Sequence, residues 1–327
     1  MGIYHAPHIS VKYLALNFRK IILFFFAHTP HTPTYNSLRI LAEKRLTTHN
    51  GVSFFVPIST IAHFFIIVCA VMILALDIGN TQLSGGVFRK DNIVLSFRCA
   101  TTKGTSSDEL GIFLRSVLRE NGIDAGAIDS IACCSVVPSL NYALTSACVK
   151  YFGKEPLMIR SGIKTGLKLR YANPREIGAD RIAAAIGAVA TLPHTNTIVV
   201  DMGTATTVDV ISKHNEYLGG AILPGITMMM HALAGGTAQL PSVEIVQPEK
   251  ACGASTVQAI QSGLYYGTLG SIRELIARYT TEAFNGEKPA VIATGGFAYL
   301  FEQTGLFDSI QPQLVLVGLR IALALNN

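Results

Sequence analysis

Tryptophan is absent from this 327-residue chain, and charged residues make up only 14% of it. The six cysteines form no C-x-x-C pair, and no histidine stands at zinc-ligand spacing from them, so the sequence predicts no zinc cluster. Cys133 and Cys134 are adjacent in an apolar run, which would place them on opposite faces of a strand. We interpret the cysteines as reduced core thiols and expect a cytoplasmic protein.

Two common nucleotide-binding motifs are also missing from the sequence. No G-x-x-x-x-G-K-[ST] segment is present, which excludes a P-loop kinase. No G-x-G-x-x-G segment follows an apolar strand, so nothing indicates a dinucleotide-binding fold. Any nucleotide chemistry of this chain must therefore use another kind of phosphate-binding turn.

The excess positive charge is confined to one end of the chain. Residues 1–71 contain six Lys or Arg and one acid, whereas the other 256 residues contain 20 bases and 20 acids. A net-neutral body gives no argument for a nucleic-acid partner, in spite of a pI near 8.9.

The segment 53–76 is nearly uncharged and long enough to be scored as a membrane span. Its last residues, 72–76, however, form the strand that leads into Asp77, and one peptide cannot lie both in lipid and in a central sheet. A secretory signal fits poorly, and a transit peptide would need a clearer amphipathic helix. We therefore expect no membrane anchor, with Met72 as the natural start and residues 1–71 as an extension outside the native fold.

One short sequence motif occurs twice in the chain. An apolar run ends on Asp77 and is followed by Gly79 and Thr81, and a second run ends on Asp201 and is followed by Gly203 and Thr204. Each copy indicates a buried strand that feeds a tight polar turn. Glycine lets backbone N–H groups approach phosphate oxygens, and a carboxylate at a strand end can hold a cation. Two copies suggest that ATP is held between two related halves.

The hydrophobic patterns predict the same order of elements in both halves: strands in a meander, then strands alternating with helices. This order indicates a duplicated α/β fold with a cleft between residues 72–190 and 191–327. The expected strands are 72–76, 86–88, 93–97, 130–136, 156–159, 197–200, 206–211, 217–223 and 290–293, and the expected helices are 107–121, 139–151, 226–233, 255–281 and 314–325.

The segment 171–181 links the halves and predicts a helix that begins at Pro174. Asn173 stands at the cap position and Glu176 three residues later, which is a capping-box pattern. Gly178 leaves space beside Asp180. The small residues of 183–188 then form a face for close packing, either in an intramolecular core or at a dimer interface.

Phosphoryl transfer requires charge neutralisation on the phosphates, a metal and a base that orients the accepting hydroxyl. Candidates for all three are present. Asp77 with its turn would hold metal and phosphate, Asp180 would be the base, and Gly295 with Gly296 would let adenosine lie against the backbone. The second side of the triphosphate would be held by Gly203, Thr204 and Thr206.

Four motifs closely resemble the type III pantothenate kinases of bacteria, a branch of the superfamily of acetate kinase, sugar kinases, Hsp70 and actin. The resemblance covers residues 72–327 and implies two ribonuclease H-like, actin-like ATPase halves. The motifs, in family order, are Asp77-x-Gly-Asn-Thr, Gly178-x-Asp-Arg, Asp201-x-Gly-Thr-Ala-Thr and Gly219-Gly-x-Ile-x-Pro-Gly225.

The resemblance implies ATP-dependent phosphorylation of pantothenate, the first step of coenzyme A synthesis, by a homodimer. Asp180 would be the proton acceptor, Asp201 would bind a monovalent cation, K⁺ or NH₄⁺, and Asp77 would bind Mg²⁺. ATP would contact Asp77, Ile78, Gly79, Asn80, Thr81, Gln82, Leu83, Ser84 and Thr204, and pantothenate would contact Tyr171, Gly178, Ala179, Asp180, Arg181 and Thr256.

Two other functions remain open from the residues alone. The same fold serves ATP-binding regulatory proteins, although 256 residues leave little room for a peptide-binding domain. A kinase for another small hydroxy compound is the other alternative, because fold analogy does not fix a substrate. Structurally, Asp180 could simply pair with Arg175 or Arg181, Tyr171 could be a packing residue, and Thr256 could cap a helix.

Overall fold

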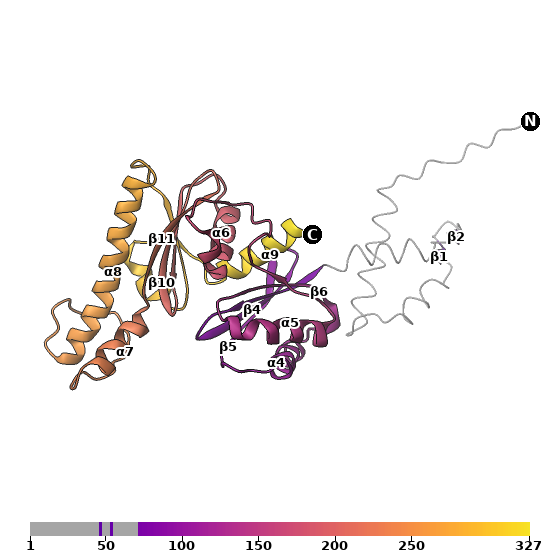
Figure 1. Cartoon of the computed structure of the whole chain (residues 1–327), viewed down its shortest axis with the longest axis horizontal. Coiled ribbons are helices and arrows are strands. Elements are labelled where there is room, and N and C mark those ends of the chain that lie inside the picture. The colour runs from indigo at the N-terminus through magenta and orange to yellow at the C-terminus, as the bar shows by residue number, and fades with distance from the viewer. Residues whose placement is uncertain (1–45, 48–52, 55–70) are drawn as a thin grey trace, which may run out of the picture. The chain divides into compact units, whose positions relative to one another are not determined.

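The computed structural model describes residues 46–47, 53–54 and 71–327 (Figure 1). The chain divides into two units, Met1–Ala70 and Val71–Asn327. In the first unit, β1 (Leu46–Thr47) pairs antiparallel with β2 (Ser53–Phe54). The expectations for a leader at residues 1–71 otherwise fall outside the described residues. Within the described residues, no helix is both long and apolar enough to cross a membrane.

The first sheet of the second unit has five strands in the order β5-β4-β3-β6-β7. Its first three strands form an antiparallel meander, and β6 and β7 then continue the sheet in parallel to β3. The elements are β3 (Met72–Ile78), β4 (Gln82–Arg89), β5 (Asn92–Ala100), α4 (Ser107–Glu120), η1 (Ala125–Ala127), β6 (Ile128–Ser135), α5 (Pro138–Phe152) and β7 (Leu157–Met158).

The second sheet repeats this topology. The strands β9, β10 and β11 form the meander, β12 and β13 continue in parallel to β9, and β8 is added at the edge beside β11. The predicted α/β class and its duplication are confirmed, whereas the boundary near residue 190 stays a prediction. The elements are β8 (Lys168–Leu169), β9 (Thr197–Met202), β10 (Ala205–Ile211), β11 (Glu216–Pro224), α7 (Ile226–Gly236), α8 (Thr256–Glu282), β12 (Ala290–Thr294), η3 (Ala298–Thr304) and β13 (Ser309–Ile310).

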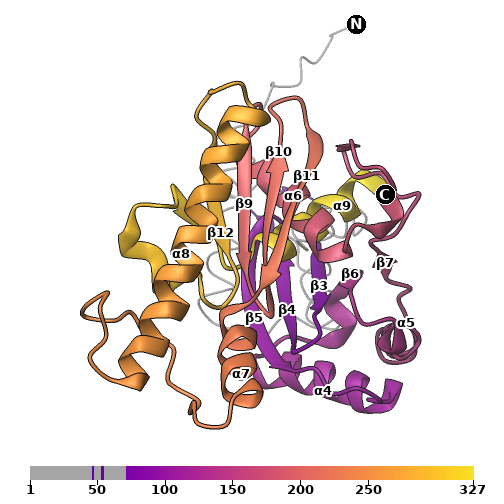
Figure 2. The ribbon, with the colours of Figure 1, turned by 60° about the vertical axis from the view of Figure 1, so that its left-hand side comes forward.

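Two helices, α6 (Ala179–Thr191) and α9 (Leu314–Asn326), form a middle layer between the sheets (Figures 1 and 2). Helix α9 contacts β3, β4 and β6 of the first sheet, and α6 contacts β6 as well as β9 and β10 of the second. The outer faces of the two sheets are covered by α4 with α5 and by α7 with α8. Three apolar cores result, and the middle core contains side chains from both sheets.

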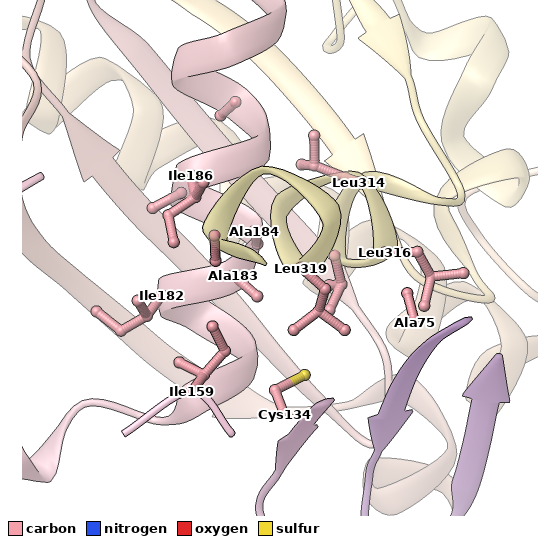
Figure 3. Close-up of a cluster of buried hydrophobic side chains, with 14 of the residues drawn as sticks. Ala75, Cys134, Ile159, Ile182, Ala183, Ala184, Ile186, Leu314, Leu316 and Leu319 are labelled. Carbon is pink, nitrogen blue, oxygen red and sulfur yellow. The ribbon is translucent and has the colours of Figure 1, made fainter. Parts of the chain in front are cut away.

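The small-residue face of α6 packs inside the molecule against α9 (Figure 3). A Cβ atom at Gly187 would collide with the carbonyl oxygen of Leu314, and one at Gly318 would collide with that of Ala183. Backbone atoms cannot move aside as a flexible side chain can, so both positions require glycine. Of the two roles predicted for this face, the structure therefore shows the intramolecular core and not a dimer interface.

The predicted helix start at Pro174 is wrong. Residues Pro174–Glu176 form only a short 3₁₀ turn, η2, and the α-helix begins at Ala179 with Gly178 as its N-cap. The reason is Ile177, which is extended and 8% exposed, because the chain leaves the helical path to bury this side chain in the middle core. The Glu176 carboxylate accepts from the side-chain amide of Asn173 instead of closing a capping box.

Candidate functional site

Asp77 lies at the end of β3, next to Cys134 on the adjacent parallel strand β6. The Cys134 thiol donates to Oδ1 of Asp77 at 3.1 Å. Burial raises the pKa of Asp77 to about 6, the thiol hydrogen bond partly opposes this rise, and the Asp180 carboxylate adds to it. Cys134 was not predicted as a site residue, because only the strand register shows that its thiol faces Asp77.

The turn after β3 is held by Thr101, which follows β5. The Gly79 N–H donates to the carbonyl oxygen of Gln82 at 3.0 Å and closes the turn. The Thr101 hydroxyl donates to the Gly79 carbonyl at 2.7 Å, and the Thr101 N–H donates to the Thr81 carbonyl at 2.9 Å. These bonds leave the side chains of Asn80 and Thr81 exposed at the tip of the turn.

The second copy of the repeated motif forms a similar turn between β9 and β10. The Gly203 N–H donates to the carbonyl oxygen of Ala205 at 3.1 Å, and the Gly225 N–H donates to the Thr204 carbonyl at 3.2 Å. The Thr204 hydroxyl donates to the Thr81 hydroxyl at 2.9 Å. The two turns, which lie 123 residues apart in the sequence, are therefore in direct contact.

Asp201 ends β9 and is half-buried. Burial raises its pKa to about 7, and the carboxylates of Asp77, Asp180 and Asp209 reinforce the rise. Gly295, with φ +87°, packs against Asp201, and a Cβ atom there would collide with the carboxylate and with the Met202 backbone. Asp77, Asp180 and Asp201 therefore lie within electrostatic range of one another, although they come from distant parts of the sequence.

Asp180 lies in the first turn of α6 and is half-buried. Its Oδ1 atom accepts a hydrogen bond of 2.8 Å from the backbone N–H of Arg181. A Cβ atom at Gly178 would collide with this carboxylate oxygen, which agrees with the space expected beside Asp180. Asp180 therefore lies in the first turn of a helix, a position where acidic side chains are favourable.

The side chain of Arg181 turns away from Asp180 and forms a buried ion pair with Asp209 of β10. Its Nε and Nη2 atoms donate to Oδ1 of Asp209 at 2.9 and 2.6 Å. The hydroxyl of Tyr217 donates to the same oxygen at 2.5 Å. The ion pair between Asp180 and Arg181 that the sequence left open is not formed.

The other predicted residues differ in the exposure of their side chains. Ile78 and Leu83 are in the core between the first sheet and α4 with α5, so only their backbone could contact a ligand. Thr206 is 2% exposed, and its predicted contact with phosphate stays a prediction. Thr256 is exposed at the first position of α8, where Ser255 and not Thr256 is the N-cap.

The remaining predicted residues lie at accessible positions. Gln82 is exposed and Ser84 half-buried at the start of β4, and Ala179 is half-buried beside Asp180. Tyr171 is half-buried, and its ring centroid lies 6.3 Å from that of Tyr217. A Cβ atom at Gly296 would meet nothing within 4 Å, so the backbone there is open as predicted for a nucleotide contact.

Within residues 71–327, no group of three or more His, Cys, Asp or Glu side chains could hold a metal ion by itself. The two strand-end carboxylates Asp77 and Asp201 nevertheless suit hard cations, since the described residues place no cationic side chain in hydrogen-bond contact with either. Mg²⁺ is usually held by one or two carboxylates, with phosphate oxygens and water as the other ligands. The site therefore fits a cation that arrives with a polyphosphate.

Two sheets that share the same order of five strands, with acidic turns that meet, define the duplicated ribonuclease H-like fold of the actin-like ATPases and their kinase relatives. A solved structure from Campylobacter jejuni, described as a conserved putative Baf family transcriptional activator, shares this fold with a TM-score of 0.50 at 20% identity, over 77% of this chain and 97% of that one. The model of the family "Type III pantothenate kinase" matches residues 73–278. This chain belongs to that family.

Curated relatives agree with this assignment. A type III pantothenate kinase of Legionella pneumophila (strain Corby) is 55% identical over 255 residues, which are 78% of this chain and 99% of the relative. One of Elusimicrobium minutum is 50% identical over 256 residues, with 78% and 99% coverage. One of Francisella tularensis subsp. holarctica is 47% identical over 255 residues, with 78% and 100% coverage.

Proposed function

We propose that this protein transfers the γ-phosphoryl group of ATP to the terminal hydroxyl of pantothenate, the first step of coenzyme A synthesis. The observation that carries the proposal is the convergence of Asp77, Asp180 and Asp201 around two polar turns joined by the Thr81–Thr204 hydrogen bond. Membership of the type III pantothenate kinase family supports the choice of substrate.

ATP would be held by its phosphates between the two turns. Residues 77–84 present backbone N–H groups and the exposed Asn80 and Thr81 side chains on one side, and Thr204 presents its hydroxyl on the other. The open backbone at Gly296 would lie along the nucleoside, next to Gly295, which packs against Asp201. In this arrangement, ATP replaces the direct contact between the two threonine hydroxyls with contacts to its own oxygens.

Asp180 would act as the base. Its carboxylate accepts the proton of the pantothenate hydroxyl as the hydroxyl oxygen bonds to the γ-phosphorus and ADP leaves. A loose phosphoryl-transfer transition state requires mainly that the base orient the nucleophile, so an ordinary carboxylate suffices. The Arg181 N–H and the N-terminal turn of α6 keep that carboxylate in place.

Asp77 would hold Mg²⁺ together with the phosphates, and Asp201 would hold K⁺ or NH₄⁺. Bound cations neutralise the phosphate charge that develops during transfer. Both carboxylates lie in a buried, electronegative setting that raises their pKa values, and a cation relieves this repulsion. Cation binding should therefore ionise both groups at neutral pH.

Pantothenate would lie against Tyr171 and residues 178–181, beside the base. The half-buried ring of Tyr171 offers an apolar wall, and the start of α6 at Gly178 offers backbone hydrogen-bonding groups. We also include Thr256 among the pantothenate contacts. It is the first residue of α8, the helix through which we propose below that the dimer forms, so its contact with substrate would depend on the dimer.

We propose that the protein forms a homodimer through α8. Gly263, Gly267 and Gly270 lie at helical spacing on an exposed face of α8, where a Cβ atom would meet nothing within 4 Å. Val257 and Tyr266 of the same helix are 44% and 39% exposed. Each glycine in an exposed helix costs about 1 kcal/mol relative to alanine, so three of them suggest close approach of another helix.

Light scattering on the eluting protein tests the dimer. Gly267→Arg should reduce the mass from that of two chains to that of one, whereas Ile112→Arg, at a 57% exposed position of α4, should leave it unchanged. A monomeric wild-type protein would refute the proposal.

We also place the enzyme in the cytoplasm, which the free state of Cys99, Cys133, Cys134, Cys148 and Cys252 supports.

The function is tested by coupled ADP release from the full chain with ATP, Mg²⁺ and pantothenate, with and without K⁺ or NH₄⁺. Turnover that requires pantothenate and increases with the monovalent ion supports the proposal. A folded protein that binds ATP but shows no pantothenate-dependent turnover contradicts it and favours another hydroxyl substrate or a regulatory role.

A further inference from the structure

Asp209 has the most completely occupied carboxylate described above, and no catalytic or binding role has been assigned to it. Its Oδ1 atom accepts from two nitrogens of Arg181 and from the Tyr217 hydroxyl, and Oδ2 accepts from Thr207 at 3.2 Å. Asp209 is 1% exposed, Tyr217 0% and Arg181 7%. Four donors thus occupy a carboxylate that is almost completely buried.

A buried ion pair of this kind adds little to the free energy of unfolding. Removing two charges from water costs several kcal/mol, and apolar replacements of similar size are often at least as stable. Burial raises the pKa of Asp209 in spite of its donors, which shows that desolvation is the largest influence on this carboxylate. Stability alone therefore does not explain why Arg181 and Asp209 form a buried ion pair.

The reason lies in what Arg181 does at its other end. Its guanidinium is fixed by Asp209, while its backbone N–H donates to Oδ1 of Asp180 at 2.8 Å. Arg181 therefore connects β10 to the carboxylate of Asp180 through two hydrogen-bonded ends of a single residue. The ion pair also keeps the only cationic side chain of the Gly178–Arg181 segment away from Asp180, which stays free to accept a substrate proton.

We propose that Asp209 is a positioning residue for Asp180: it anchors the Arg181 side chain to β10 and thereby fixes the first turn of α6 and the carboxylate at its start. This inference rests on the proposed role of Asp180 as the base. Asp209 itself is 1% exposed, so we expect it to contact neither substrate nor ATP. Loss of the anchor would leave the Arg181 side chain free to turn toward Asp180, the acidic residue next to it in the chain.

Asp209→Asn tests the inference, because it keeps the shape and removes the charge. We expect kcat to fall roughly 10- to 100-fold, as for a small displacement of a catalytic group, with KM for ATP within about 2-fold of the wild type. Tyr217→Phe keeps the ion pair and removes one donor, so its kcat should stay within about 3-fold. An unchanged kcat in folded Asp209→Asn overturns the inference.

A double-mutant cycle separates positioning from general stability. If Asp209 acts through Asp180, adding Asp209→Asn to Asp180→Asn should lower the residual kcat by less than about 2-fold, since the two changes share one route. A full 10- to 100-fold loss in that background would mean that Asp209 acts elsewhere and would overturn the inference. If Asp180→Asn alone leaves turnover intact, the proposed base is wrong and the inference fails with it.

If Asp209→Asn folds poorly, a second variant can test the inference instead. Arg181→Met with Asp209→Leu replaces the buried pair by apolar side chains of similar size, which should restore the thermal midpoint. We expect kcat to stay low in this variant, because Asp180 loses its anchor. Recovery of wild-type kcat would show that Asp209 only compensates a buried charge and would overturn the inference.

Discussion

The hydroxyl of Thr204 donates to the hydroxyl of Thr81 at 2.9 Å, and this single bond joins the two copies of the repeated acidic turn. Each threonine is exposed at the tip of its own turn. If ATP binds between the two turns as proposed, it would separate the two hydroxyls, and both would become available to its phosphates.

Thr204→Val tests the proposed contact of the Thr204 hydroxyl with ATP, since valine keeps the shape of the side chain and lacks the hydroxyl. One lost hydrogen bond corresponds to about 0.5–1.5 kcal/mol, so KM for ATP should rise about 2- to 13-fold while KM for pantothenate stays nearly constant. Thr204→Ser keeps the hydroxyl and should behave as the wild type. Equal values for the valine and serine variants would argue against a role of this hydroxyl in ATP binding.

Asp180→Asn should abolish most of the turnover. Loss of a general base costs about 10²- to 10⁴-fold in kcat, whereas ATP binding, measured by calorimetry, should be unaffected. The matched control is Glu176→Gln, an exposed carboxylate four residues earlier in the chain, which should keep wild-type kcat. Normal turnover of Asp180→Asn would rule out the assigned role.

Asp201→Asn should stabilise the cation-free protein at alkaline pH. Because the folded protein raises the pKa of Asp77 to about 6 and of Asp201 to about 7 from 3.8, it retains protons that the unfolded chain loses. The free energy of unfolding therefore falls as pH increases from about 4 to about 7. Removing one such group should raise Tm by roughly 2–6 °C at pH 8 and hardly at all at pH 4.

Calorimetric scans in chelator and sodium buffer measure this shift. The same variant should lose the response of turnover to K⁺, since the proposed ligand of the monovalent ion is gone. A Tm at pH 8 that equals that of the wild type, or a preserved K⁺ response, would count against the position assigned to the cation.

Gly318→Ala should destabilise the middle layer. The new methyl group would meet the Ala183 carbonyl oxygen, and forcing the backbones apart costs about 1–3 kcal/mol, or about 2–12 °C in Tm. Gly235→Ala in α7, where a Cβ atom meets nothing within 4 Å, serves as the control and should be neutral or slightly stabilising. Similar Tm values for the two variants would contradict the packing of α6 on α9.

The sequence alone determined the order of the longer strands and the two acidic turns, whereas the short strands β8 and β13 were not predicted. Short apolar runs that end in Asp77 and Asp201 have few physical solutions other than a buried strand with a polar turn, so β3, β9 and their turns were predicted correctly. The family motifs also predicted Asp77, Asp180 and Asp201 as the carboxylates of the site. These are local signals, and they survive folding because each depends on neighbours in the chain.

Tertiary structure decided what depends on distant residues. The thiol of Cys134 faces Asp77 only because of the register between β3 and β6, and Ile177 interrupts the predicted helix because its side chain is buried in the middle core. The small-residue face of α6 could have met another subunit, and the close approach of Gly187 to α9 places it inside the chain. Packing and pairing across the sheets set these outcomes, and no short window of sequence contains them.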